Sequence, residues 1–210
     1  MTKYFTRDKL YYFRRTLTHP ADSFYEIRHR DFGSIPLALI TVFVFSLCFT
    51  LNRIFAGFIV NMIDPRTVNG LVDLQSVVLL FLLFSIGNWS VTCLMGGEGR
   101  LKDIMVVTGY SLIPLILTHI PAILISNVLA ANEEVFYTII LGSGIIWTAV
   151  LILMGIMTVH NYTLLKTFLT LIITFVSMLI IIFLALLLFD LLNQVTIFFR
   201  SIYTELILRG

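Results

Sequence analysis

Residues 167–189 read TFLTLIITFVSMLIIIFLALLLF, and no charged side chain interrupts this run. An α-helix rises about 1.5 Å per residue, so a helix of this length crosses the hydrocarbon core of a bilayer, which is about 30 Å thick. Four further uncharged runs of comparable length precede it: Phe32–Asn52, Leu74–Gly97, Ile104–Asn132 and Val135–Leu165. The chain has 210 residues, so the connections between the runs are too short to form a second folded domain.

The composition agrees with a chain that lies in lipid. Hydrophobic residues make up 59% of it and charged residues 12%, with a mean hydropathy of +0.99, whereas soluble chains are about half apolar and roughly a quarter charged. These values exclude a soluble enzyme and a secreted disulfide scaffold, and a net charge of +2 gives no reason to expect nucleic-acid binding. The two cysteines, Cys48 and Cys93, lie inside apolar runs and form no zinc or disulfide spacing.

We therefore predict an all-α integral membrane protein: a bundle of five transmembrane helices with amphipathic interfacial helices at the N- and C-terminal ends, and no metal or cofactor. The expected division is a basic and aromatic arm over residues 1–33, a membrane domain over 34–193 and an amphipathic segment over 194–210. The predicted spans are about 35–60, 72–95, 104–129, 135–159 and 167–192. The arm lacks an apolar segment beside a small-residue cleavage site, so we expect no signal peptide and a complete chain.

Lysine and arginine are unevenly divided between the two sides that five spans define. One side carries ten, namely Lys3, Arg7, Lys9, Arg14, Arg15, Arg28, Arg30, Arg100, Lys102 and Lys166, and the other carries four, Arg53, Arg66, Arg200 and Arg209. Cytoplasmic flanks of spanning helices carry the excess of these residues. We expect a protein of the cell membrane with its N-terminus in the cytoplasm and its C-terminus extracellular or periplasmic.

Both end segments have helical patterns. In the arm, Leu10, Phe13 and Leu17 share one face, and Ser23-x-x-Glu26 has the form of a capping box ahead of Ile27, so we expect two short interfacial helices. The arm either docks onto anionic lipid or a cytoplasmic partner, or serves only as a positive-inside anchor with snorkelling side chains. At the other end Val195, Phe198, Phe199, Ile202 and Leu206 form one stripe, which indicates a helix along the outer interface or, alternatively, a partner-docking helix.

Three predicted spans carry small and hydroxyl residues at helical spacing. They are Ser85, Asn88, Thr92 and Gly96 in the second span, Thr167, Thr170, Thr174 and Ser177 in the fifth, and Gly144, Thr148 and Gly155 in the fourth. Helices in lipid associate through such residues, so we expect these faces to pack together. A polar conduction path along them is the less favoured alternative.

The third span contains the segment Gly109-Tyr110-Ser111-Leu112-Ile113-Pro114, followed by His119 and Pro121. Two prolines free backbone carbonyls and kink the helix. On a straight helix His119 shares a face with Thr108, Ser111, Ala122 and Ser126. An ionisable residue in the membrane is a candidate for a proton relay or a substrate contact. With no carboxylate partner evident at mid-depth, we favour a neutral histidine bonded to a neighbouring helix. The candidate packing or functional residues are Asn88, Trp89, Gly109, Tyr110, Ser111, Pro114, His119 and Pro121.

Two charged residues lie near predicted outer ends of spans. Arg53 and Asp190 can each snorkel to the interface, or they can pair with one another. Catalytic motifs find little support: Gly142-Ser143-Gly144 lacks the first glycine of the rhomboid-protease motif, and Glu133-Glu134 lacks the Arg and His elements of the intramembrane CAAX proteases. We therefore expect that the protein is not an enzyme.

Three further segments occur in a fixed order. They are HPADSFYEI at residues 19–27 with Gly33-Ser34 after it, Asn88-Trp89 with GGEGRLKDI at residues 96–104, and GYSLIP at residues 109–114. Together they resemble the Yip (Ypt/Rab-interacting protein) domain family, in particular its compact bacterial members. The resemblance implies a non-enzymatic protein of five membrane helices with a cytosolic N-terminus and no catalytic residues to carry over.

The family also suggests functions. Its eukaryotic members resemble adaptors for small GTPases and vesicle traffic, with long cytosolic N-terminal regions, whereas this arm is short. Bacterial members look like accessory proteins that accompany transporters, notably ABC systems. The glycine-rich turn itself either docks a partner's helix through Arg100 and Lys102 or is simply a tight turn with orientation charges. The candidate partner-docking residues are Arg14, Arg15, Phe24, Ile27, Gly97, Arg100, Lys102, Phe198 and Ile202.

The sequence thus favours an accessory or scaffold subunit that assists the assembly or regulation of a membrane transporter complex, ABC-type most of all. Its expected partners are the lipid bilayer and transporter permease subunits, and we expect no nucleic-acid partner. The sequence leaves open whether the protein also forms a homo-oligomer. The alternative is an autonomous small transporter, channel or lipid-moving protein that uses the kinked third span.

Overall fold

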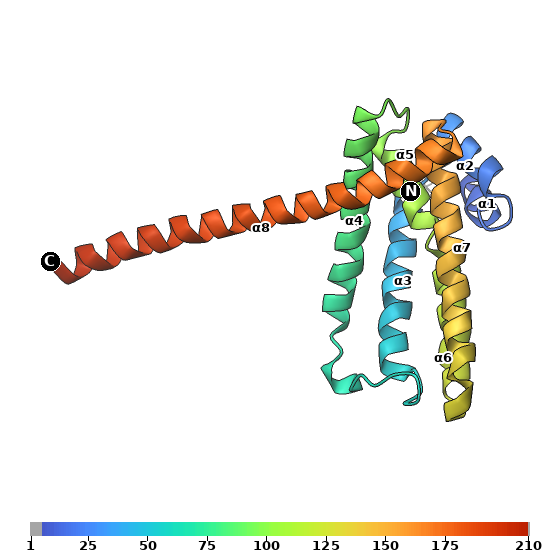
Figure 1. Cartoon of the computed structure of the whole chain (residues 1–210), viewed down its shortest axis with the longest axis horizontal. Coiled ribbons are helices and arrows are strands. Elements are labelled where there is room, and N and C mark those ends of the chain that lie inside the picture. The colour runs from blue at the N-terminus through green and yellow to red at the C-terminus, as the bar shows by residue number, and fades with distance from the viewer. Residues whose placement is uncertain (1–5, 210) are drawn as a thin grey trace.

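The computed structural model describes residues 6–209, and every regular element in them is a helix (Figure 1). The elements in chain order are α1 Arg7–Arg15, α2 Pro20–His29, α3 Ile35–Phe55, the 3₁₀ turn η1 Pro65–Thr67, α4 Gly70–Leu94, α5 Leu101–Tyr110, α6 Ile113–Ser126, the 3₁₀ turn η2 Ala131–Glu133, α7 Glu134–His160 and α8 Leu164–Arg209. The predicted all-α class is confirmed. Lys3 lies outside the described residues, as does the side chain of Arg209.

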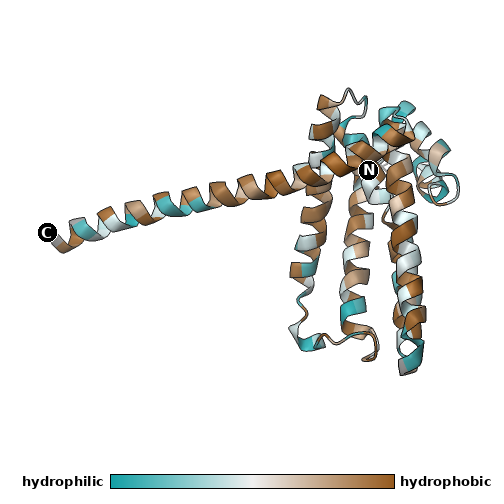
Figure 2. Ribbon diagram, in the orientation of Figure 1, coloured by the Kyte–Doolittle hydropathy of each residue, from teal (hydrophilic) through white to brown (hydrophobic). Residues whose placement is uncertain are grey.

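Within the described part, five helical segments are long and apolar enough to cross a membrane. They are Ile35–Phe55, Gly70–Leu94, Leu101–Ser126, Glu134–His160 and Leu164–Glu205. Figure 2 shows hydrophobic residues along α3, α4, α6 and α7, with hydrophilic residues gathered towards their ends. The prediction of a multi-pass membrane protein with five such helices is therefore confirmed.

The first span ends earlier than the apolar sequence suggested. The prediction extended to residue 60 because the chain stays apolar after Arg53, but α3 ends at Phe55. Gly57 then lies against the end of α6, where its N–H donates to Ser126 Oγ at 2.9 Å. A Cβ at this glycine would stand 2.1 Å from the Ser126 carbonyl oxygen, so the connection turns directly against α6.

The helices α3, α4, α6 and α7 stand side by side (Figure 1), with α6 packed along α7 and α3 in contact with α4, α5 and α6. The buried apolar core lies at one end of this arrangement, where α2 packs against α5 and α7. Its largest members include Phe24, Ile27, Ile104, Tyr110 and Ile156. Many side chains on the outer faces are exposed and apolar, as a lipid-facing surface requires.

The arm forms two short helices, in the region where two were predicted. Phe13 of α1 and Leu17, in the turn after α1, pack against the core, while Leu10 is 42% exposed. The second helix begins at Pro20, earlier than the expected cap at Ser23, because a proline suits the first helical position. Ser23 is therefore buried inside α2, and Phe24 and Ile27 follow it into the core.

The helix α8 is one uninterrupted element from Leu164 to Arg209, so no separate C-terminal helix follows the fifth span. No glycine or proline breaks this stretch, which explains its continuity. The first part of α8 packs against α4, and the rest leaves the bundle at a steep angle to α3, α4 and α7 (Figure 1). The predicted bundle of five spans thus consists of four spans side by side, formed by α3, α4, α5 with α6, and α7, and of a fifth span, α8, that joins them only through its N-terminal part.

Candidate functional site

The glycine-rich turn between α4 and α5 lies directly against the end of α7. Gly96 has a φ of +67°, a left-handed conformation that suits glycine. A Cβ at Gly97 would lie 2.5 Å from His160 Nδ1, and one at Gly99 would lie 2.5 Å from Val159 Cγ1. The glycines therefore allow a close approach of backbone to helix, in addition to the tight turn expected from the sequence.

Polar contacts fix this approach. The Gly99 N–H donates to His160 Nδ1 at 3.1 Å, and the Tyr162 hydroxyl donates to the Met95 carbonyl at 3.3 Å. The rings of His160 and Tyr162 stack at 5.3 Å, and Lys166 Nζ lies 3.9 Å above the Tyr162 ring. The turn is thus fastened to the α7–α8 connection.

The carboxylate of Asp103, whose side chain is 2% exposed, joins the turn to the arm. It accepts hydrogen bonds from Arg100 Nε at 2.9 Å and from Arg28 Nη1 at 3.4 Å, and the Arg100 backbone N–H donates to it at 3.3 Å. Arg28 also donates to the Glu98 carbonyl. One buried carboxylate therefore links α2, the turn and the first residues of α5.

A second carboxylate, Asp31, closes the same network at the surface. It contacts Lys102 Nζ at 2.8 Å and Arg100 Nη2 at 3.0 Å. The hydrogen bond from Lys102 is the main cause that lowers the pKa of Asp31 below its usual value. The hydrogen bond with Asp103 is the main cause that raises the pKa of the Arg100 guanidinium. We name Arg28, Asp31, Arg100, Lys102 and Asp103 the arm–turn network.

This network changes the interpretation of several predicted docking residues. Arg100 and Lys102 are engaged by the chain's own Asp31 and Asp103. Phe24 and Ile27 are 0% and 1% exposed, because α2 packs into the core, so neither side chain is available to another protein in this structure. Contacts within the chain thus occupy these four side chains, and docking of another protein at these positions stays a prediction.

The remaining members of that set lie at the surface. Arg15 pairs with Asp22 at 3.4 Å, and Arg14 is exposed on α1. Phe198 and Ile202 are 61% and 40% exposed on α8.

Sequence reasoning missed Asp31, the ion pairs of Asp103 and the role of Arg28. The only signal was the presence of acidic residues beside Arg30 and Lys102. Spacing along the chain gave no reason to join residues about seventy positions apart.

The GYSLIP segment lies at the start of the membrane-embedded part. A Cβ at Gly109 would lie 2.6 Å from Ala38 Cβ, so the glycine lets α5 cross close to α3. The Tyr110 hydroxyl accepts a hydrogen bond from the Ser34 N–H at 3.2 Å. The third span is interrupted at Ser111-Leu112, ahead of Pro114, and Pro121 lies inside α6. The predicted distortion of this span is therefore present as a break between two helices.

His119 lies on a buried face with Thr108, Ser111, Ala122 and Ser126, as the helical spacing predicted. Its Nδ1 lies 2.7 Å from the Leu115 carbonyl of its own helix, and its ring meets the Phe45 ring of α3 edge-on at 5.6 Å. The expected hydrogen bond to a neighbouring helix is thus replaced by one within α6 and an aromatic contact to α3.

Two of the three polar stripes pack together. Asn88 of α4 donates to Thr174 Oγ1 of α8 at 3.1 Å, and a Cβ at Gly87 would meet Met178 Cγ at 3.2 Å. The third stripe faces elsewhere: a Cβ at Gly144 would meet Thr118 of α6, and one at Gly155 would meet Val107 of α5. The expectation of a common face is therefore wrong for α7, since that helix packs beside α5 and α6. Trp89 is 41% exposed.

The charged residues near the outer ends do not pair as suggested. Arg53 forms its ion pair with Asp73 of α4, whose other oxygen accepts from Thr50 Oγ1 at 3.1 Å. Asp190 instead accepts from Gln194 Nε2 on α8 at 3.1 Å. The two cannot meet, because α8 carries Asp190 away from α3 (Figure 1).

Comparison with known proteins gives one family. Residues 14–187 match the Yip1 domain. No curated protein and no solved structure gives a significant match. The match covers most of the chain and includes all three resembling segments, so the chain belongs to the Yip1 domain family.

Proposed function

We propose that this Yip1-family protein is a non-enzymatic accessory or scaffold subunit that assists the assembly or regulation of a membrane transporter complex, with an ABC-type permease as the favoured partner. The observation that carries the proposal is the unpartnered length of α8. Every described side chain from Ile182 to Glu205 is exposed, and this stretch leaves the other helices (Figure 1). A helix that buries none of these side chains within its own chain is suited to packing against another membrane protein.

A charged residue within this stretch strengthens the proposal. Asp190 stands between Phe189 and Leu191, which are 64% and 58% exposed. A carboxylate near hydrocarbon is costly unless polar groups or water surround it, and Gln194 supplies one such group. A partner helix with a hydrogen-bond donor beside Asp190 would supply further polar groups to this carboxylate.

The orientation we propose has the N-terminus in the cytoplasm and the C-terminus outside, in the cell membrane. It is supported by the basic residues of α1, α2 and the glycine-rich turn, which lie at one end of the bundle. The uncharged segment 167–189 of α8 is long enough to cross the bilayer. The proposed orientation requires this segment to run alongside α3, α4 and α7 in the membrane, in place of the steep angle of Figure 1.

Affinity purification of the full-length protein in mild detergent tests the proposal. We expect a transporter permease subunit to co-elute at a fixed ratio, and Asp190→Ala to reduce its yield several-fold. The matched control is Glu205→Ala on the same helix, which should leave the yield unchanged. A protein that elutes alone, or an equal loss in both variants, would contradict the proposal.

A further inference from the structure

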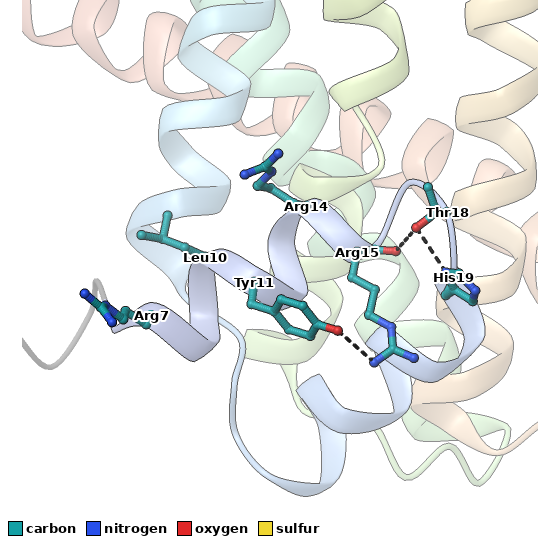
Figure 3. A pocket seen from close by; sticks show the side chains of 7 residues that line it. All are labelled: Arg7, Leu10, Tyr11, Arg14, Arg15, Thr18 and His19. Atoms are coloured by element: carbon teal, nitrogen blue, oxygen red, sulfur yellow. Dashed lines mark hydrogen bonds between the residues drawn. The ribbon is translucent and has the colours of Figure 1, made fainter.

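The outward face of α1 and the loop after it form a shallow groove of about 740 Å³ that carries basic and aromatic side chains (Figure 3). Arg7, Arg14 and Arg15 supply its positive charge, and Leu10 and Tyr11 lie between them. Leu10 and Tyr11 are 42% and 56% exposed. The groove thus combines guanidinium groups with exposed apolar and aromatic surface, which is typical of a surface in contact with lipid head groups.

Contacts of α1 set the height of this groove relative to the bilayer. Phe13 of α1 packs edge-on against Tyr110 with 4.8 Å between the ring centroids. The Tyr110 hydroxyl accepts a hydrogen bond from the N–H of Ser34, the residue before α3. The ring of Tyr12 stacks on Phe32 at 5.0 Å. Since α3 begins at Ile35, these contacts hold α1 at the level where the first span enters the membrane, which is the level of the head groups.

Two of the three arginines have no acidic partner among the described residues 6–209. Among residues 6–209, neither Arg7 nor Arg14 takes part in an ion pair, and they lie two helical turns apart on α1. Arg15 is partly engaged, with Asp22 Oδ2 and the Tyr11 hydroxyl each 3.4 Å from its guanidinium nitrogens. Figure 3 shows Arg15 turned towards Tyr11, while Arg7 and Arg14 extend from the helix. These two side chains are therefore free to bind an anion from outside the chain.

We propose that this groove binds the phosphate head group of an anionic phospholipid of the cytoplasmic leaflet, with Arg7 and Arg14 as its principal ligands. Planar guanidinium groups suit phosphate oxygens because they can donate two parallel hydrogen bonds. Leu10 and Tyr11 then contact the glycerol backbone and the upper acyl chain. A lipid held here would fix the arm to the membrane surface and so stabilise the position of α1 on the bundle.

Native mass spectrometry of the full-length protein in mild detergent tests this site. The protein is titrated with phosphatidylglycerol and with phosphatidylcholine of the same acyl chains, and we expect preferential retention of phosphatidylglycerol. A basic residue near an anionic surface contributes a factor of about five in binding, so R7Q/R14Q should weaken phosphatidylglycerol binding about thirtyfold. The charge-retaining R7K/R14K should recover most of this loss.

The matched control is R66Q/R200Q, which removes two arginines that α1 does not carry and should change binding less than about twofold. If the double variant R7Q/R14Q fails to fold, the single variants R7Q and R14Q serve, each with a loss of about fivefold.

A tenfold excess of glycerophosphate over lipid should not displace the lipid; displacement would assign the groove to a soluble anion. Equal retention of both lipids, as expected for a groove that takes an acidic peptide, or equal losses in R7Q/R14Q and R66Q/R200Q, would overturn the proposal.

Discussion

Asp103 is the residue on which the arm–turn network depends. Its buried carboxylate is shared by Arg28 and Arg100, so Asp103→Asn leaves Arg28 without its carboxylate partner and leaves Arg100 with Asp31 alone. Loss of one partner from a buried ion pair costs several kcal/mol, and since both arginines are partly exposed we expect about 3 kcal/mol. The measurement is thermal unfolding of the purified protein in detergent.

The matched control is Asp22→Asn. This residue pairs with Arg15 at 3.4 Å with its side chain 64% exposed, and exposed pairs contribute less than about 1 kcal/mol. Equal destabilisation by the two variants would show that Asp103 has no special structural role.

The lowered pKa of Asp31 predicts a pH dependence of stability. A carboxylate whose pKa is lower in the folded than in the unfolded protein stabilises the fold above the unfolded value, near 3.8, and loses that effect as the pH falls through the folded value. The substitution Asp31→Asn suits the left-handed φ of 58° at this position, because asparagine tolerates it. We expect the variant to unfold at a lower temperature than the wild type at about pH 6 and the two curves to converge as the pH falls below 3.8 and through the lowered pKa of Asp31. A constant difference across this range would contradict the role of the Asp31 carboxylate.

At the scale of helices, the crossing of α3 and α5 depends on Gly109. An added methyl group would stand 2.6 Å from Ala38 Cβ and 2.9 Å from its Cα. Neither neighbour is a flexible side-chain end, so the helices must separate, and we expect Gly109→Ala to cost about 2 kcal/mol of unfolding free energy.

The control for this crossing is Gly142→Ala on α7, where no atom lies within 4 Å of the added Cβ. Alanine is the better helix former, so this variant should be neutral or slightly stabilising. The comparison uses chemical unfolding in detergent. Two variants of equal stability would contradict the close approach.

The helices themselves were predictable from the sequence, because long uncharged runs have one solution in a bilayer. Their ends were less predictable. The first span was predicted to reach residue 60, since apolar residues continue, but the contact of Gly57 with Ser126 ends α3 at Phe55. The continuity of α8 through residue 194 was missed because its surface pattern changes there while its backbone does not.

The candidate site was predictable only in part. Glycine-rich sequence indicated a turn, and small residues indicated the α4–α8 contact that Asn88 and Thr174 make. The ion-pair partners of Arg100, Lys102 and Arg53 could not be predicted. Ion pairs between distant segments depend on how the helices are placed, and they produce no recognisable spacing in the sequence. Phe24 and Ile27 were assigned to a partner because a helix with an apolar face can bury it within its own chain or outside it.

At the scale of the whole molecule, two parts differ in how far their side chains are buried and paired within the chain. The bundle end formed by α2, α5, α7 and the glycine-rich turn has a buried core and a closed arm–turn network. The outer part of α8 has neither, and its described side chains beyond Ile181 are exposed. The first part is therefore a fixed base on the cytoplasmic side in our proposal, and the second is the surface that meets a partner.

Site-specific photo-crosslinking from α8 in native membranes tests this account most directly. A photoreactive phenylalanine analogue is placed at Leu191 or Phe198, which are exposed, and at Met178, which is 7% exposed against α4, as the matched control. We predict that the two exposed positions crosslink to a second membrane protein, a transporter subunit, and that Met178 crosslinks only within the chain. Crosslinks from Leu191 and Phe198 to lipid alone, or only to a second copy of this chain, would contradict the scaffold function.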